Sequence, residues 1–245
     1  MTGFQDLIAG VGDYIFSRSF LIGALNTIKL TLAAQAAAVI LGFVLALAKM
    51  SSWKALQGLA SAYIWIFRGI PVLVQLIFVF NALPQFGIKL SPFESAFVAL
   101  ALNEAAYMAE IVRSGLSSVG KGQQRAGRAL GMSSWQRMRH IVLPQAFRVI
   151  LPPTANQFVG MLKTSAMASV VGYTDLLMTA QQTASANFNY VDTLVAAVVY
   201  YLAFTAIFTL FQSYLERRMD ISRRTSRPAK RRIWRMSGRD SEQAA

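Results

Sequence analysis

The chain has 245 residues, of which 55% are hydrophobic and 14% are charged, whereas about 25% of residues are charged in an ordinary soluble domain. This composition argues against a soluble globular protein, a disordered chain and a coiled coil. The chain has no cysteine and one histidine, which excludes disulfide scaffolds, thiolate sites and multi-histidine metal sites. The net charge of +13 is concentrated in residues 110–150 and 217–245, and basic segments beside apolar spans are typical of the cytoplasmic side of a membrane.

The apolar segments are long enough to cross a bilayer. A spanning helix needs about 20 apolar residues, because each residue rises about 1.5 Å through about 30 Å of hydrocarbon. Three segments are uncharged over such a length: 30–48, 69–88 and 193–215. Two less apolar spans begin near Ser95 and Val149 and include Glu104 and Lys163, and such polar groups usually face a protein interior or a cavity. The sequence therefore predicts an all-α membrane protein with about five transmembrane helices.

The distribution of Lys and Arg predicts the orientation of these spans. Basic residues follow the first, third and fifth spans, whereas each connection on the other side carries at most one. This asymmetry places the N-terminus outside and the C-terminus in the cytoplasm. We expect an extracytoplasmic segment over 1–20, a transmembrane domain over 21–218 and a basic cytoplasmic tail over 219–245, for which anionic lipid is a candidate partner.

A patterned segment over about 116–145 joins the third and fourth spans. Small, polar and basic residues dominate 121–130, which favours a short exposed helix that docks onto a partner over an ordinary cytoplasmic loop. Gly131 is expected to end this helix. Pro144 is expected to end the helical run that follows, and Pro152–Pro153 to mark the start of the fourth span.

Several motifs in this chain occur in a known order. Gly131, nine residues and then Ile141-Val142-Leu143-Pro144 match the signature EAA, three residues, Gly, nine residues, I-x-L-P, and Gly122-Gln123 precedes it. Arg68-Gly69-Ile70-Pro71, followed by Gln75, is similar to a second-span motif R-G-T-P…Q. Together these residues resemble the integral membrane permease subunits of ATP-binding-cassette importers for polar amino acids.

This resemblance implies a type I importer permease fold in a bacterial plasma (inner) membrane, with a cytoplasmic coupling helix. The implied ATPase-coupling residues are Gly122, Gln123, Arg125, Ala126, Gly127, Leu130, Gly131 and Met132. The implied partners are cytoplasmic ATP-binding subunits, a second permease subunit and an extracytoplasmic amino-acid-binding protein. No G-x-x-x-x-G-K-[ST] motif occurs, so ATP and Mg²⁺ would be bound by the partner and this chain would hold no cofactor. A nucleic-acid partner is not expected.

Two departures from the family pattern affect the expected substrate and coupling. The EAA triplet reads Arg125-Ala126-Gly127, so an arginine replaces the usual glutamate, and the family's usual Asp after Lys163 is Thr164. Both departures are similar to a subset that imports glutamate and aspartate, which favours an acidic substrate. Glutamine or a basic amino acid is the alternative within the family, and a secondary transporter is the alternative outside it.

An amino acid in transit carries a carboxylate and an ammonium, so its path needs donors and acceptors near the membrane midplane. The candidates are Gln75, Glu104, Asn156, Gln157, Lys163, Thr164 and Ser165. Lys163 could neutralise a substrate carboxylate, or it could pair with Glu104 or extend to the interface. Asn156 and Gln157 could contact substrate or bridge helices.

Overall fold

The computed structural model describes residues 10–218, which are helical and contain no strand. Its α-helices are α2 (Arg18–Lys49), α3 (Lys54–Gly69), α4 (Val72–Ile77), α5 (Pro92–Ser117), α6 (Lys121–Ala129), α7 (Ser134–Arg137), α8 (Leu143–Thr164), α9 (Leu176–Asn187) and α10 (Tyr190–Arg218). Phe78–Ala82 and Met138–Val142 are π-helical, and Leu83–Phe86 and Ser165–Val171 are 3-10 helices. Residues 1–9 of the predicted N-terminal segment, and the whole of the predicted tail, lie outside the described residues.

The long apolar helices agree with the predicted membrane domain. Within residues 10–218, α2, α5 and α10 are each long and apolar enough to cross a membrane. The pair formed by α3 and Val72–Phe86 reaches the same apolarity together, but it is bent by 101° at its break. Helix α8 has 22 residues and carries Arg148 and Lys163, so its role as a further span stays a prediction.

The second predicted span is broken rather than continuous. Helix α3 ends at Gly69, and Pro71 is the N-cap of α4 and has a ψ of 134°. Ile70 before it is also extended, as residues that precede a proline commonly are. The Nε2 of Gln75 donates hydrogen bonds to the carbonyls of Phe67 at 2.9 Å and Ile70 at 2.8 Å. These bonds satisfy carbonyl groups that the broken helix leaves without a partner.

The expected roles of the prolines in the fourth span were wrong. Helix α7, the π-helical stretch and α8 follow one another with helical backbone angles, and Pro144 lies in the first turn of α8. Pro152 and Pro153 lie inside α8 and do not mark its start. A proline lacks one backbone donor and crowds the preceding turn, and the wider π turn before α8 is a common way to accommodate such an irregularity.

Close packing of α2 on α5 forms the centre of the fold. Ala34 and Ala38 are fully buried, and a Cβ on Gly42 would lie 2.5 Å from the Cβ of Met108. Small residues of this kind let two membrane helices approach closely. The small residues of the first span therefore pack within this chain, at least on the face that meets α5.

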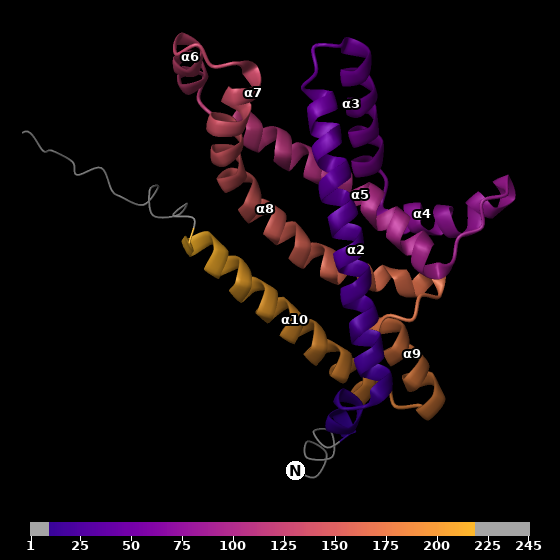
Figure 1. The fold of residues 1–245 in the computed structure, drawn as a ribbon. Coiled ribbons are helices and arrows are strands. Elements are labelled where there is room, and N and C mark those ends of the chain that lie inside the picture. Colours follow the sequence, from indigo (N-terminus) through magenta and orange to yellow (C-terminus); the bar gives the residue numbers. More distant parts are fainter. Residues whose placement is uncertain (1–9, 219–245) are drawn as a thin grey trace, which may run out of the picture.

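The predicted coupling helix is present as α6, and Gly131 follows it with a φ of +76°. A positive φ is unfavourable for residues with a Cβ, so glycine suits the turn after α6. Ser133 then begins α7 with a capping box. In Figure 1, α6 and α7 lie at one end of the fold, whereas α9 and the start of α2 lie at the other.

Candidate functional site

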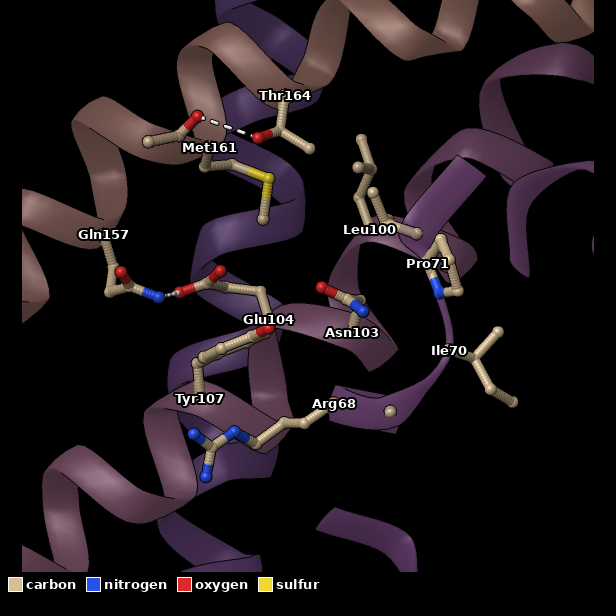
Figure 2. Close-up of a pocket in the computed structure, with 13 residues that line it drawn as sticks. Arg68, Ile70, Pro71, Leu100, Asn103, Glu104, Tyr107, Gln157, Met161 and Thr164 are labelled. Atoms are coloured by element: carbon tan, nitrogen blue, oxygen red, sulfur yellow. Dashed lines mark hydrogen bonds between the residues drawn. The ribbon is translucent and has the colours of Figure 1, made fainter. Parts of the chain in front are cut away.

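A polar cavity of about 460 Å³ opens where the α3–α4 break faces α5 and α8 (Figure 2). Its lining comprises Arg68, Gly69, Ile70, Pro71 and Val72 at the break, Leu100, Asn103, Glu104 and Tyr107 of α5, and Gln157, Gly160, Met161 and Thr164 of α8. Three separate segments therefore contribute to one site. A cavity of this size between helices can hold a small polar molecule.

Glu104 is the carboxylate of this cavity, and only 8% of it is exposed. The Nε2 of Gln157 donates a hydrogen bond to its Oε1 at 2.9 Å, which joins α5 to α8. The alternative pairing of Glu104 with Lys163 is not formed. A buried carboxylate with one amide partner keeps further acceptor positions for an ammonium or guanidinium group.

Arg68 is the cation of the cavity. Its guanidinium lies 5.1 Å from the ring centroid of Tyr107, which is a cation–π distance. Arg68, Gly69 and Tyr107 also line a second, more open hollow of about 420 Å³. The Arg68–Tyr107 pair therefore forms a wall between the two hollows.

Lys49 at the end of α2 and Glu110 of α5 line the second hollow and belong to a group of ion pairs. The Nζ of Lys49 contacts Glu110 Oε1 at 2.5 Å, and Arg113 contacts Glu110 Oε2 at 2.9 Å. Because two cations share Glu110, this carboxylate is neutralised within the chain.

Hydrogen bonds hold the break against α5. Asn103 Nδ2 donates to the carbonyl of Phe67 at 2.9 Å, and the hydroxyl of Tyr63 donates to the carbonyl of Leu102 at 2.8 Å. The position of the cavity wall is thus fixed by polar contacts between α3 and α5.

The structure brings together only some of the predicted pathway residues. Glu104, Gln157 and Thr164 line the cavity, whereas four others do not: Gln75, Asn156, Lys163 and Ser165. Gln75 supports the helix break, as described above, and Ser165 is buried with its hydroxyl on the carbonyl of Leu162. Asn156 and Lys163 are exposed.

Sequence reasoning did not place Arg68, Asn103 and Tyr107 in the site. The sequence indicates Arg68 only as the first residue of the Arg68-Gly69-Ile70-Pro71 motif. The available signal was the spacing of Asn103, Glu104 and Tyr107, which falls within one helical turn of an otherwise apolar span. Their meeting with Arg68 depends on the packing of α3 on α5, which spacing does not predict.

The predicted coupling residues fall in two groups. Gly122, Gln123, Arg125, Ala126, Leu130 and Gly131 are exposed, whereas Gly127 is buried and Met132 is half-buried. A Cβ on Gly127 would lie 2.8 Å from Ile141 Cδ1, so α6 packs closely on the stretch after α7 at this glycine. Gln145 Nε2 donates to Gln123 Oε1 at 2.9 Å and ties α6 to α8.

The described residues form a bundle of apolar helices around a polar cavity, with a short polar helix at one end, which is the arrangement expected of a membrane permease. Residues 38–221 match the family of binding-protein-dependent transport system inner membrane components. The chain belongs to this family and is a multi-pass protein of the bacterial plasma membrane. As a member of it, the chain is a transport component.

Curated relatives cover most of the chain. The arginine transport system permease protein ArgU of Corynebacterium glutamicum is 39% identical over 85% of this chain and 70% of its own length. The arginine transport system permease protein ArtQ of Bacillus subtilis is 36% identical over 80% of this chain and 90% of its own length. The glutamine transport system permease protein GlnP of Escherichia coli K12 is 33% identical over 81% of this chain and 92% of its own length.

Solved structures confirm the fold. A crystal structure of an amino acid ABC transporter with histidines has a TM-score of 0.78 and 41% identity, covering 82% of this chain and 94% of that chain. An inward-facing structure of the MetNI methionine ABC transporter has a TM-score of 0.69 at 20% identity, covering 82% of this chain and 96% of that chain. The second similarity concerns the fold alone. The predicted type I importer permease fold is therefore confirmed.

Proposed function

We propose that this chain is the permease subunit of an ATP-driven importer of polar amino acids, and that the cavity beside Glu104 holds the amino acid in transit. The observation that carries the proposal is the presence of Glu104 and Arg68 in one cavity of about 460 Å³. A carboxylate suits the ammonium of an amino acid, and a guanidinium suits its carboxylate. The relatives named for arginine and glutamine transport support the same substrate class.

The energy for transport comes from partners in this proposal. The sequence contains no P-loop motif, so cytoplasmic subunits would bind ATP and Mg²⁺ and would dock onto α6. A second permease subunit and an extracytoplasmic binding protein would complete the complex. Nucleotide-driven movement of α6 would reach the cavity through α5 and α8, which alternates access between two global states.

The cavity also bears on the choice of amino acid. If Glu104 binds the substrate ammonium and Arg68 the carboxylate, no further cation of the cavity lining is left for an acidic side chain, and Lys163 is exposed outside it. The preference for glutamate and aspartate that the two sequence departures predict stays a prediction. We favour arginine or glutamine over it, because a second carboxylate near Glu104 would be repelled.

The test is substrate-stimulated ATP hydrolysis and uptake by the complete complex in lipid vesicles, with arginine, glutamine, glutamate and aspartate compared. We expect Glu104→Gln to lower uptake about tenfold or more, as loss of a charged hydrogen-bond partner does. Asn156→Ala, at an exposed position of α8, is the matched control and should retain uptake. Stimulation by glutamate instead of arginine or glutamine would reverse the substrate order, and normal uptake by Glu104→Gln would remove the cavity from the pathway.

A further inference from the structure

Helix α6 presents a row of three cations that form no ion pair within residues 10–218. Lys121, Arg125 and Arg128 are spaced i, i+4 and i+7, which places them on one face of a helix. All three are exposed. No Asp or Glu occurs between Glu110 and Asp175 in the sequence, and Glu110 already pairs with Lys49 and Arg113. The positive charge of this row is therefore not compensated by its neighbours in the sequence.

The opposite side of α6 is fixed to the rest of the chain. Gly127 is buried and lies close against Ile141, and Gln123 is hydrogen-bonded to Gln145 of α8. The Nη1 of Arg137 donates to the carbonyl of Met132 at 2.6 Å and holds the turn after α6. These contacts fix the position of α6, and its three cations lie on the face opposite the packed side.

The exposed basic face of α6 suits a protein partner better than a membrane surface. Helices that lie in a membrane interface bury a face of large apolar side chains, but the apolar residues of α6 are only alanine and glycine. Leu130 and Trp135 are 80% and 67% exposed beside α6, and Arg and Trp are enriched among the residues that contribute most to protein interfaces. Figure 1 shows α6 at the extreme end of the fold, where a partner can reach it.

We infer that the partner ATPase surface that receives α6 is acidic, with carboxylates opposite Lys121, Arg125 and Arg128. This inference rests on the proposed function and extends it to the chemistry of the partner. The family resemblance places a glutamate at position 125, and a groove built for that glutamate would meet Arg125 here. Charge complementarity of this kind steers association and rejects partners with the wrong charge, so this permease would select its own ATPase.

The test measures binding of the partner ATPase to the full-length chain in neutral-lipid nanodiscs at low and high salt. The triple variant Lys121→Gln, Arg125→Gln, Arg128→Gln removes the charges and keeps residues with similar helix propensity. We expect it to weaken binding about tenfold or more at low salt and to flatten the salt dependence. Lys54→Gln removes an exposed cation at the start of α3 and is the control that should bind normally.

Charge reversal makes the test specific. Arg125→Glu should weaken binding more than Arg125→Gln, and changing a facing carboxylate of the ATPase to lysine should restore it. Binding that is strong but indifferent to these charges would overturn the inference and leave the proposed function intact. Failure of the unaltered chain to bind any ATPase would contradict the proposed function itself. If the triple variant lost binding to anionic vesicles but still bound the ATPase, the three cations would be assigned to lipid binding, and the inference would also be overturned.

Discussion

At the scale of single residues, the cavity depends on two side chains of opposite charge, each held by a neighbour. Gln157 holds Glu104, and the ring of Tyr107 lies beneath the guanidinium of Arg68. Neither contact is a full ion pair, so both charged groups keep capacity for a ligand. The Arg68–Tyr107 wall also separates the cavity from the hollow around Glu110.

The wall predicts a difference between two substitutions of Tyr107. Tyr107→Phe keeps an aromatic face for Arg68, whereas Tyr107→Leu removes it, and a cation–π contact contributes about 0.5–1 kcal/mol at exposed sites. We expect Tyr107→Leu to raise passive leak of amino acid through nucleotide-free proteoliposomes about two- to fivefold, and Tyr107→Phe to leave it near the unaltered level. Equal leak in the two variants would show that the ring face does not close the wall.

At the scale of helices, the approach of α2 to α5 positions the whole α5 contribution to the cavity. Gly42 lies against the Cβ of Met108, and a Cβ at this position would also lie 3.0 Å from Ala105 O and Ala109 N. Backbone atoms cannot move aside as the end of a flexible side chain can. The close approach of α2 to α5 therefore requires glycine at position 42, which has a hydrogen atom where other residues have a side chain.

This packing predicts a strong effect of Gly42→Ala. Overpacking at a rigid contact costs about 1–3 kcal/mol, so we expect a lower thermal midpoint of the purified chain in detergent. Gly58→Ala in α3 is the matched control, because no atom lies within 4 Å of its added Cβ and alanine favours helix over glycine by about 1 kcal/mol. A midpoint that falls equally in both variants would contradict the packing argument.

At the scale of the whole molecule, the two ends of the fold differ in charge. The end with α6 and α7 carries exposed cations such as Arg125 and Arg139, whereas α9 at the other end has no charged residue. The asymmetry of Lys and Arg predicts that the first end lies in the cytoplasm. Docking of an ATPase at α6 requires the same orientation.

Because the sequence has no cysteine, a single introduced cysteine is the only residue of the chain that a thiol reagent labels, and the orientation can be tested in this way. We expect Ser134→Cys of α7 and Ser51→Cys before α3 to react with a membrane-impermeant maleimide only in inside-out vesicles. Ser185→Cys of α9, an exposed position, should react only from the outside of intact cells. Labelling of positions 134 and 185 from the same side would contradict the predicted topology.

The sequence by itself determined the properties that depend on composition and local spacing. Apolar length predicted α2 and α10, a less apolar span predicted α5, and the polar run before Gly131 predicted α6, because helix length and helix ends are encoded within a few residues. The uncharged segment 69–88 was predicted as a span in the same way, but the structure breaks it. Only the tertiary structure decided what lies together. The packing of α3 on α5 brings Arg68 to Tyr107, and α8 turns Gln157 toward Glu104 while Lys163 stays exposed. Those contacts join residues distant in the chain, and their geometry follows from how helices bend and pack, which local spacing does not specify.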